Sequence, residues 1–475
     1  MLLPSLFTDY MTTFRSSKKV NLMANDLFKS EGDINYGIER DNYISKIKDS
    51  KTKELLERDS KVFYHQALST PCMQALSYAD QSSIFDIAGN DYLDFHGNNV
   101  HLLGYGHPRL IAALQKQMNT LPFSPRRFTN ETIVQLAEEL VKRSDGDMGR
   151  VLFSPSGAIA MGMAIKLARK VTGRYKTISL WDSFHGASMD TISIGGEAIF
   201  RNDIGPLMPG AHLAPPPDPQ GCLWQCGDAC NAHCASYIEY ILKKEGDIAA
   251  VIAEPMRSVP IIPPAEYWQR IRKACDEHGT LLIFDEIPNG LGRTGSFYTY
   301  KQYGIIPDMV VLGKALGGGL IPFAGVLGKS LFNAVLKNTA IGHYTYEKNP
   351  LGAAVALELM KILDEENLIA LGKEKSKIIE EEVKAWKYTY KIIDSFRASS
   401  LLMGIVLDKD HPYWTKLDVA EFLMYECLRN GLNFKVSQGH ILTLTPPLTI
   451  TISEIKRALN ILKRAFDALY TRCQR

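Results

Sequence analysis

A lysine separates an apolar run from three glycines in the stretch Met309-Val310-Val311-Leu312-Gly313-Lys314-Ala315-Leu316-Gly317-Gly318-Gly319. Four consecutive apolar residues before a glycine predict a short strand that is buried on both faces. Lys314 therefore follows the end of a strand, and the glycines after it allow a tight turn of the backbone. Taken alone, such a lysine could equally be a solvated side chain beside a turn.

Similar apolar runs recur through the middle of the chain. They are Val151-Leu152-Phe153, Thr177-Ile178-Ser179-Leu180, Ala249-Ala250-Val251-Ile252-Ala253 and Leu281-Leu282-Ile283-Phe284. Helical patterns lie between many of them, for example at 162–171 and 267–278. Strands that are apolar throughout and are separated by helices predict an α/β fold with a mostly parallel sheet covered on both faces.

The flanks of this region have a different character. Residues 1–60 are polar and charged, with helical stretches such as 43–59, and we interpret them as an N-terminal arm. Residues 61–104 are predicted to form the N-terminal part of a small domain, since two short extended runs at 84–86 and 92–95 flank a turn. His107-Pro108 then begins a helix that runs through Leu121.

The predicted large domain spans residues 105–345, and residues 346–475 are predicted to form a smaller C-terminal α+β domain. Its helices are longer, with β-like runs at 400–407 and 440–444. The segment from Ala214 to Pro219 is interpreted as a proline-rich surface loop of the large domain.

Charge and composition exclude several classes of function. The chain of 475 residues has 54 basic and 52 acidic side chains, so it has no general electrostatic attraction for nucleic acid or an anionic membrane. It has no apolar run near the roughly 20 residues of a membrane helix. Residues 1–30 do not have the pattern of a signal peptide. We therefore expect a cytoplasmic protein whose cysteines are reduced.

Four of the eight cysteines recur every four residues, at Cys222, Cys226, Cys230 and Cys234, and His233 is adjacent. Four thiolates can bind zinc, but structural zinc sites generally use tighter Cys-x-x-Cys pairs. We therefore predict no metal and interpret these residues as small, semi-buried side chains of an insertion before a helix at 237–244.

An aspartate and a lysine follow two of the predicted strands. Asp285 ends the run 281–284, so its carboxylate lies at the carboxyl edge of the sheet, where α/β proteins bind ligands. Alone, Asp285 could be a helix cap or a surface residue. Together with Lys314 it is more specific, because pyridoxal 5'-phosphate (PLP) requires a lysine for its Schiff base and an acidic partner for its pyridine nitrogen.

Two further segments fit the same cofactor. Ser156-Gly157-Ala158 follows the strand at 151–153 and precedes a helix, where free backbone N–H groups bind anions such as phosphate. Phe184-His185 follows another strand, and an aromatic ring there can stack on a flat pyridine ring. Each segment alone has an ordinary explanation, in a small-residue loop or in core packing.

Taken together, the motifs resemble those of the class III aminotransferases. The lysine run 311–319, the aspartate motif Asp285-Glu286-Ile287 with 290–295, and the strand end Glu254-Pro255 are similar to motifs of this family, as are Thr345-Tyr346 with 349–351 and Pro446-Pro447-Leu448. The resemblance covers the chain from about residue 75 to the C-terminus. It implies the PLP-dependent transferase fold type I, with a sheet of the seven-stranded type, and a homodimer whose active sites are shared between subunits.

The resemblance also implies the role of individual residues. Lys314 would be the Schiff-base lysine and proton shuttle, and Asp285 would pair with the pyridine nitrogen. Phe184 would stack on the cofactor ring, and Thr345 would donate to the cofactor phosphate of the neighbouring subunit. The remaining cofactor contacts that it implies come from Ser156, Gly157, Ala158, His185, Glu254 and Ile287.

Three departures from the family pattern affect the expected reaction. Thr443 stands where the family usually has an arginine that clamps the substrate α-carboxylate, and a threonine cannot replace a bidentate guanidinium. Pro288 replaces a glutamine near the cofactor, and the phosphate loop has Pro155 and Ile159 where Asn and Glu are common. Transamination between an amino acid and a keto acid should therefore suffer, whereas a lyase needs no carboxylate clamp.

Three segments resemble the bacterial (R)-1-hydroxy-2-aminoethylphosphonate ammonia-lyases of aminophosphonate breakdown: 95–101, 181–188 and 214–219 with the cysteines behind it. This resemblance implies release of ammonia and phosphonoacetaldehyde. An ω-aminotransferase for a small amine, a phospho-lyase for an amino-alcohol phosphate and a non-catalytic PLP-fold protein remain open. Candidate substrate contacts are Asn98, Asn99, His101, Arg126 and Arg127.

Overall fold

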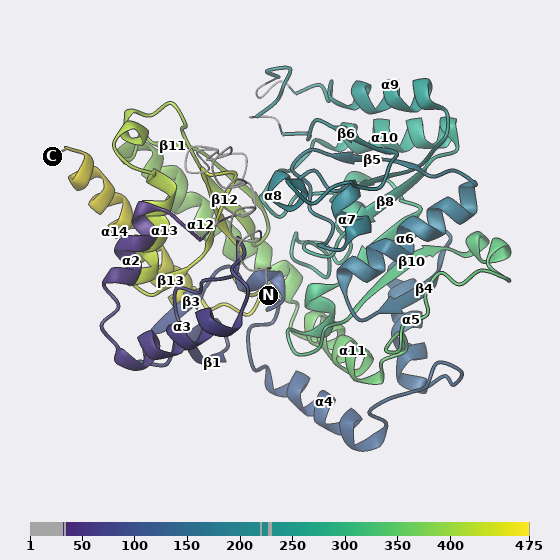
Figure 1. Cartoon of the computed structure of the whole chain (residues 1–475), viewed down its shortest axis with the longest axis horizontal. Coiled ribbons are helices and arrows are strands. Elements are labelled where there is room, and N and C mark those ends of the chain that lie inside the picture. Colours follow the sequence, from purple (N-terminus) through teal and green to yellow (C-terminus); the bar gives the residue numbers. More distant parts are fainter. Residues whose placement is uncertain (1–31, 33–34, 219–220, 227–229, 475) are drawn as a thin grey trace, which may run out of the picture.

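The computed structural model describes residues 32, 35–218, 221–226 and 230–474. Figure 1 shows two lobes side by side. We call the lobe built on a seven-stranded sheet the large lobe, and the lobe that carries two four-stranded sheets the small lobe. None of the helices in the described part of the chain is long and apolar enough to cross a membrane.

The sheet of the large lobe has the strand order β4-β10-β9-β8-β7-β5-β6. Its strands are β4 (Met148–Ser154), β5 (Lys176–Leu180), β6 (Ala211–Ala214), β7 (Ile248–Ala253), β8 (Leu281–Asp285), β9 (Met309–Leu312) and β10 (Ala324–Lys329). Strand β10 is antiparallel to both of its neighbours, and the pairs from β9 through β6 are parallel. The predicted mostly parallel, seven-stranded sheet is therefore confirmed.

Both faces of this sheet are buried, as the apolar runs predict. Successive residues of a strand point to opposite faces. In β7, Val251 and Ala253 belong to the same core as Trp268 of α10 (Ala265–His278), whereas Ile252 packs in a second core with Ala164 of α6 (Gly157–Thr172). Helices thus cover the sheet on its two sides, which explains why its strands lack polar alternation.

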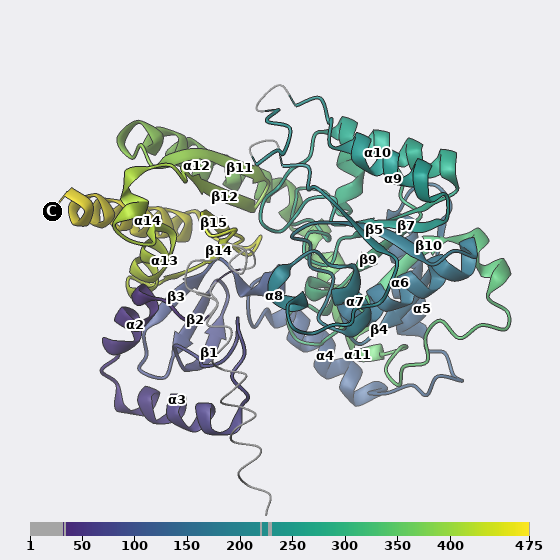
Figure 2. The same ribbon diagram turned by 45° about the horizontal axis from the view of Figure 1, so that its top comes forward.

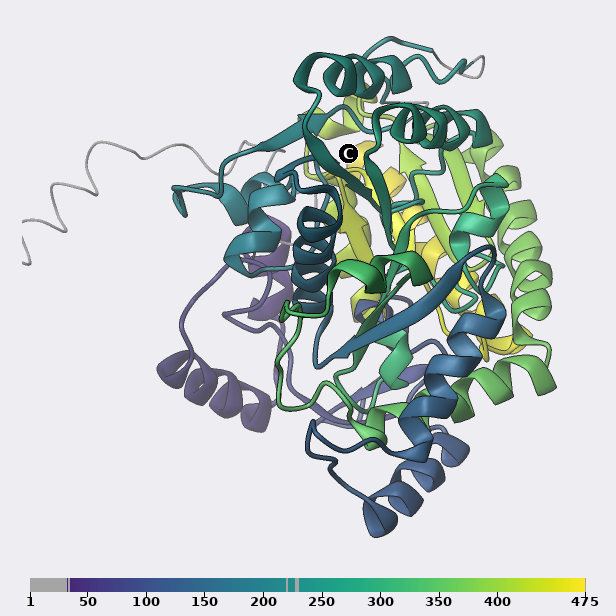
Figure 3. The ribbon, with the colours of Figure 1, turned by 90° about the vertical axis from the view of Figure 1, so that its right-hand side faces the viewer.

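The other helices of the large lobe surround this core. They are α4 (Pro108–Thr120), α5 (Glu131–Arg143), α7 (Met189–Ile194), α8 (Ala198–Arg201), α9 (Ala235–Glu245) and α11 (Pro350–Glu365). Pro108 begins α4 as predicted, because proline is well suited to the first helical position. In Figure 3, seen from the side of the large lobe, the yellow-green C-terminal elements lie behind the large sheet.

The small lobe is formed by segments from both ends of the sequence. Its first sheet consists of β1 (Leu76–Asp80), β2 (Ser83–Asp86), β3 (Asp91–Asp94) and β13 (Leu432–Asn433), and its second of β11 (Ile393–Ser399), β12 (Leu402–Leu407), β14 (Lys435–Ser437) and β15 (Ile441–Leu444). The predicted hairpin is confirmed, since Ile84 pairs with Tyr92 across β2 and β3. Strand β13 is parallel to β3, with Leu432 opposite Leu93.

Helices α2 (Ile38–Ser45), α3 (Ser50–Val62), α12 (Leu368–Thr389), α13 (Val419–Arg429) and α14 (Ile452–Gln474) complete the small lobe (Figure 2). The helical stretch predicted at 43–59 is wrong in one respect, because it is divided at residues 46–49. Asp49 caps α3 by accepting the Thr52 N–H at 2.6 Å, and this cap separates the two helices. The part of the predicted arm before residue 32 lies outside the described residues.

The proline-rich segment after β6 was predicted to be a surface loop, and this prediction is wrong for part of it. Pro217 and Asp218 are buried rather than on the surface, and Asp218 pairs with Arg397 of β11 at 3.0 Å. This segment therefore contacts the small lobe. The domain boundaries predicted at residues 61, 105 and 346 stay predictions.

Candidate active site

Five strands of the large sheet bring their carboxyl ends to one edge. The residues singled out for chemistry follow these ends: Ser156 after β4, His185 after β5, Glu254 after β7, Asp285 as the last residue of β8, and Lys314 after β9. In open α/β sheets this edge is where ligands bind. Residues that are far apart in the sequence are thus brought to one side of the large lobe.

Asp285 is held in a fixed orientation inside the protein. It is 1% exposed, and its Oδ2 lies 2.8 Å from Nδ1 of the buried His185, while its Oδ1 accepts the Ile287 N–H at 3.1 Å. A buried carboxylate requires such donors, because an unsatisfied charge in the interior is costly. The arrangement fits the anionic partner of a protonated ring nitrogen.

The hydrogen bonds continue behind His185. Its Nε2 lies 3.2 Å from Ser179 Oγ, which lies 3.1 Å from Ser183 Oγ, and Ser183 donates to the Leu180 carbonyl at 2.7 Å. These contacts fix the plane of the imidazole that contacts Asp285. The signal that could have revealed Ser179 is a polar residue within the apolar run 177–180.

Lys314 begins a short 3-10 helix, η6 (Lys314–Gly317), with a φ of 45°. A positive φ is uncommon for a residue with a side chain and persists only where the surroundings enforce it. Helix η6 packs against a second 3-10 helix, η3 (Gly97–Asn99). Lys314 is half-buried where the end of β9 meets the segment after β3.

The start of α6 can hold an anion. Ser156 is the N-cap and accepts the Ile159 N–H at 3.3 Å, while Gly157 and Ala158 occupy the first helical positions, whose N–H groups have no partner within a helix. A Cβ at Gly157 would lie 2.8 Å from Ile287 Cδ1, so the backbone approaches this side chain closely. The donors fit a phosphate group.

The other predicted cofactor contacts have different surroundings. Phe184 is half-buried, with its ring centroid 4.6 Å from that of Phe200. Glu254 is buried, and its Oε2 accepts the Ser258 N–H at 3.0 Å. Thr345 is exposed on the turn that precedes α11. Ile287 packs against Gly157 and Gly313.

The candidate substrate contacts fall into two groups. Asn98 and Asn99 lie in η3 beside η6, both with positive φ. Asn99 is buried, and its Oδ1 has no hydrogen-bond partner among the described residues, so it can accept from a ligand. His101 is fully buried with Nε2 3.0 Å from the Asp94 carbonyl, and its Nδ1 has no hydrogen-bond partner among the described residues.

Arg126 and Arg127 lie in the loop between α4 and α5. The Arg126 guanidinium contacts the His343 ring, and Phe123 of the same loop packs edge-on against Tyr346, with ring centroids 5.5 Å apart. The structure therefore groups Arg126 with the turn that holds Thr345.

Comparison with known proteins identifies the family. The model of the family described as aminotransferase class-III matches residues 64–466. The chain belongs to the class III aminotransferases.

Two curated relatives and one solved structure illustrate this family. An (R)-1-hydroxy-2-aminoethylphosphonate ammonia-lyase of Vibrio splendidus is 46% identical over 455 residues, covering 92% of this chain and 95% of the relative. A 5-aminovalerate aminotransferase of Pseudomonas aeruginosa is 30% identical, covering 88% and 100%. An amine transaminase from an uncultivated Pseudomonas species, solved in its PLP-bound form, has a TM-score of 0.79 and 28% identity, covering 86% of this chain and 99% of that chain. The predicted fold is confirmed.

Two residues near the candidate site of this class III aminotransferase were not predicted. His96 follows β3, and burial, then the Lys435 ammonium group, lowers its pKa to about 4; Lys314 acts on it in the same direction. Its imidazole is therefore neutral near pH 7. His96 lies in the segment 95–101 that carries part of the resemblance, but it was not singled out there. The second residue, Lys435, lies in a short strand and carries no specific sequence signal.

The cysteine insertion lies before α9. Cys222, Cys226 and Cys230 are half-buried, and Cys234 directly precedes α9, so their predicted semi-buried position is largely confirmed. The thiols of Cys222 and Cys226 lie 3.5 Å apart, and burial raises the pKa of the Cys234 thiol to about 12.

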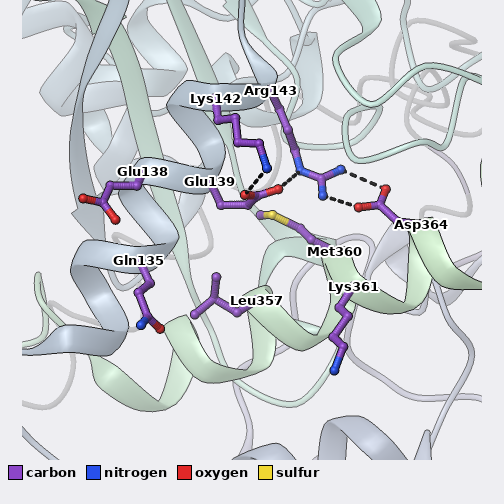
Figure 4. A pocket seen from close by; sticks show the side chains of 9 residues that line it. All are labelled: Gln135, Glu138, Glu139, Lys142, Arg143, Leu357, Met360, Lys361 and Asp364. Carbon is purple, nitrogen blue, oxygen red and sulfur yellow. Dashed lines mark hydrogen bonds and ion pairs between the residues drawn. The ribbon is translucent and has the colours of Figure 1, made fainter.

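A surface hollow between α5 and α11 lies apart from the candidate active site (Figure 4). Arg143 Nε donates to Glu139 at 2.8 Å, and its terminal nitrogens reach Asp364 of α11, one of them at 3.1 Å. These contacts tie the two helices together. None of the residues singled out for chemistry lines this hollow.

Proposed function

We propose that this class III aminotransferase is a PLP-dependent ammonia-lyase that converts (R)-1-hydroxy-2-aminoethylphosphonate to phosphonoacetaldehyde and ammonia. The relative from Vibrio splendidus carries the name of this activity and is 46% identical over nearly its whole length. The reaction belongs to the breakdown of aminophosphonates, and we expect it to take place in the cytoplasm.

The structural observation that carries the proposal is Thr443. It is buried on β15, and its hydroxyl donates to Ser437 Oγ at 3.0 Å. A neutral hydroxyl that is already hydrogen-bonded cannot act as the bidentate cation that a planar carboxylate requires. This feature disfavours a keto acid as the second substrate and favours a reaction that needs none.

The residues at the sheet edge fit the cofactor. Ser156, Gly157 and Ala158 would hold the phosphate through the start of α6, and Asp285, oriented by His185, would hold the ring nitrogen in its protonated form. PLP supplies an electron sink that stabilises the charge left when a proton departs from the carbon bearing the amino group. Phe184 and Ile287 would pack against the pyridine ring of the cofactor.

Lys314 would act as the base in this reaction. Its amine takes the proton from the carbon that bears the substrate amino group. The hydroxyl on the neighbouring carbon would then take this proton from Lys314 and leave as water, and the electron pair of the broken carbon–hydrogen bond would form the carbon–carbon double bond of an enamine. Hydrolysis of the enamine consumes one water and releases ammonia and phosphonoacetaldehyde, so that the reaction balances without an oxidant or a keto acid.

A homodimer is part of the proposal. Thr345 and Tyr346 are exposed on the turn before α11, and Tyr346 packs against Phe123 of the α4–α5 loop, in which Phe123 and Phe128 are also exposed. Exposed aromatic side chains that cluster in this way favour a protein contact. Light scattering on the PLP-loaded protein should give about twice the chain mass of 53.1 kDa.

The test is ammonia release from (R)-1-hydroxy-2-aminoethylphosphonate by the PLP-loaded protein with no keto acid present. Equal amounts of ammonia and phosphonoacetaldehyde would support the lyase. Absence of ammonia, with turnover restored by pyruvate or 2-oxoglutarate, would instead make the protein an aminotransferase and refute the argument from Thr443.

A further inference from the structure

A tight turn in the insertion before α9 brings two thiols together. The Gln225 N–H donates to the Cys222 carbonyl at 2.9 Å, which closes a turn over residues 222–225. Gln225 has the left-handed conformation, with a φ of 53°, and directs the chain back toward Cys222. The sulfurs of Cys222 and Cys226 consequently lie 3.5 Å apart. A disulfide bond is about 2.05 Å long, so a movement of about 1.5 Å would join them.

Contacts on both sides hold this turn in place. The half-buried Trp224 packs against the main core, and its ring centroid lies 6.2 Å from that of His233. Asn231 Oδ1 accepts the His233 N–H at 3.2 Å and lies 3.9 Å from Cys226 Sγ. These contacts connect the turn to the segment that leads into α9. Two reacting groups that the fold holds near each other react much faster than free groups do.

The surroundings of Cys222 favour its reactive form. Its sulfur accepts the Trp224 N–H at 3.3 Å. Burial opposes ionisation, but the hydrogen bonds from the backbone at Cys226 and Trp224 outweigh it and lower the pKa of the Cys222 thiol. The hydrogen bond with Cys222, followed by burial, raises the pKa of the Cys226 thiol. Because the thiolate is the nucleophile, Cys222 should react with an oxidant first and Cys226 second.

Other cysteines of the described part of the chain are placed less well for oxidation. Four are buried: Cys234, Cys275, Cys427 and Cys473. Burial raises the pKa of both Cys234 and Cys275 to about 12. Cys72 is half-buried like the pair, but its sulfur lies 3.5 Å from the Ser69 carbonyl oxygen, and burial raises the pKa of its thiol. Cys72 is therefore a suitable comparison for Cys222.

We propose that Cys222 and Cys226 are a site of reversible oxidation, at which hydrogen peroxide converts the two thiols to a disulfide. The Cys222 sulfur attacks one peroxide oxygen, the O–O bond breaks, and the departing hydroxide takes a proton and becomes water. The Cys226 sulfur then attacks the sulfenic acid at Cys222. The S–S bond forms, the S–O bond breaks, and the departing hydroxide takes the Cys226 proton as a second water.

This reaction balances, because the two thiols lose two electrons and two protons while the peroxide is reduced to two waters. A thiol reductant reverses it by exchange with the disulfide. The neighbouring thiol captures the sulfenic acid before a second oxidation makes it irreversible. Cys226 therefore protects Cys222 from permanent damage.

The experiment treats the PLP-loaded wild type, Cys226→Ser and the control Cys72→Ser with a small molar excess of hydrogen peroxide. Iodoacetamide then marks the remaining free thiols, and mass spectrometry of the proteolytic peptides gives the state of each cysteine. A second portion receives dithiothreitol before marking, because this reductant restores a disulfide but not a sulfinic acid. Zinc content is measured before oxidation, and far-UV circular dichroism checks that each variant is folded.

In the wild type and Cys72→Ser we expect a disulfide between Cys222 and Cys226 that dithiothreitol reverses. The free thiol of Cys222 should disappear at least about tenfold faster than that of Cys72 in the wild type. In Cys226→Ser, dithiothreitol should not restore Cys222, because no neighbouring thiol captures its sulfenic acid.

Four results would overturn the proposal. They are full marking of both thiols after peroxide treatment, a disulfide from Cys226 to Cys230 instead, full recovery of Cys222 in Cys226→Ser, and zinc bound to these thiols in the isolated protein. Each would leave the proposed lyase reaction standing, since neither thiol takes part in it.

Discussion

At the scale of single residues, the candidate site contains charged side chains that neighbouring groups hold in place, as His185 holds Asp285. Asp285 and Lys314 could be predicted from the sequence, because each follows an apolar strand and lies next to recognisable motifs. The contact between His185 and Asp285 could not be deduced from spacing, since the two are 100 residues apart and meet only because β5 and β8 end at the same edge.

Replacement of Lys314 tests the proposed base. Lys314→Ala should retain the fold and reduce ammonia release by at least about a hundredfold, because no other group is proposed to move the proton. Turnover and far-UV circular dichroism measured on the same sample separate loss of chemistry from loss of fold. Substantial residual turnover in a folded variant would contradict the assigned role.

Glu286 predicts a dependence of stability on pH. Burial raises its pKa from 4.5 to about 7, although its carboxylate accepts the N–H groups of Thr299 at 2.6 Å and Tyr300 at 2.8 Å. Because the folded state binds this proton more tightly, the contribution to stability is full below pH 4.5 and is lost as pH rises through about 7. The loss is at most about 3 to 4 kcal/mol, since one pKa unit corresponds to about 1.4 kcal/mol.

Urea unfolding of the wild type and Glu286→Gln between pH 5 and pH 8 measures this effect. The variant is expected to be less stable overall, because an amide cannot accept both N–H groups, but its stability should fall less steeply as pH rises. Equal slopes in the two proteins would show that Glu286 does not titrate in this range.

At the scale of elements, apolar runs predicted five strands of the large sheet, but β6 and β10 were missed. Strand β10 contains Gly325 and Gly328, and glycine weakens the sequence signal of a strand. The structure explains Gly325, because a Cβ there would lie 3.0 Å from Phe153 Cδ1 and 3.1 Å from the Leu152 carbonyl oxygen. A requirement set by the neighbouring strand cannot be recognised in the strand's own sequence.

Gly186 is expected to control the shape of the phosphate site. It has a φ of 127°, and a Cβ would lie 2.7 Å from Ala158 Cβ and 2.9 Å from Ala158 Cα at the start of α6. Because a backbone atom cannot move aside alone, Gly186→Ala should displace the first turn of α6 and weaken PLP binding by at least about tenfold. Absorbance titration of the apo-protein with PLP measures this change.

Gly246→Ala is the matched control. Gly246 also has a positive φ, of 69°, but an added Cβ would meet nothing within 4 Å. Its replacement should cost only about 1 kcal/mol of backbone strain and leave PLP binding unchanged. Equal PLP affinity in the two variants would refute the role of Gly186 at the phosphate site.

At the scale of the whole molecule, the arrangement of the lobes depends on contacts between distant parts of the sequence. The pairing of β13 with β3 and the contact of Asp218 with Arg397 both join such segments. Composition indicated a surface loop at 214–219, since proline-rich segments usually lie outside, but Pro217 and Asp218 are buried where Asp218 pairs with Arg397. The family resemblance predicted the architecture well, whereas the contact between Asp218 and Arg397 could not be deduced from the sequence.

The pair of Asp218 and Arg397 should stabilise the docking of the two lobes. Both side chains are nearly buried, and the arginine also donates to the Pro260 carbonyl at 3.4 Å. Removal of one partner of a buried ion pair costs about 3 kcal/mol, because the other charge stays in the interior without that partner. Asp218→Asn should therefore lower the thermal unfolding temperature and increase proteolysis at the loop.

Asp247→Asn is the control. It removes a carboxylate from a more exposed ion pair with Lys176, and it should change stability by less than about 1 kcal/mol. If the two variants unfolded at the same temperature, the contact at Asp218 would contribute no more to stability than a surface ion pair does.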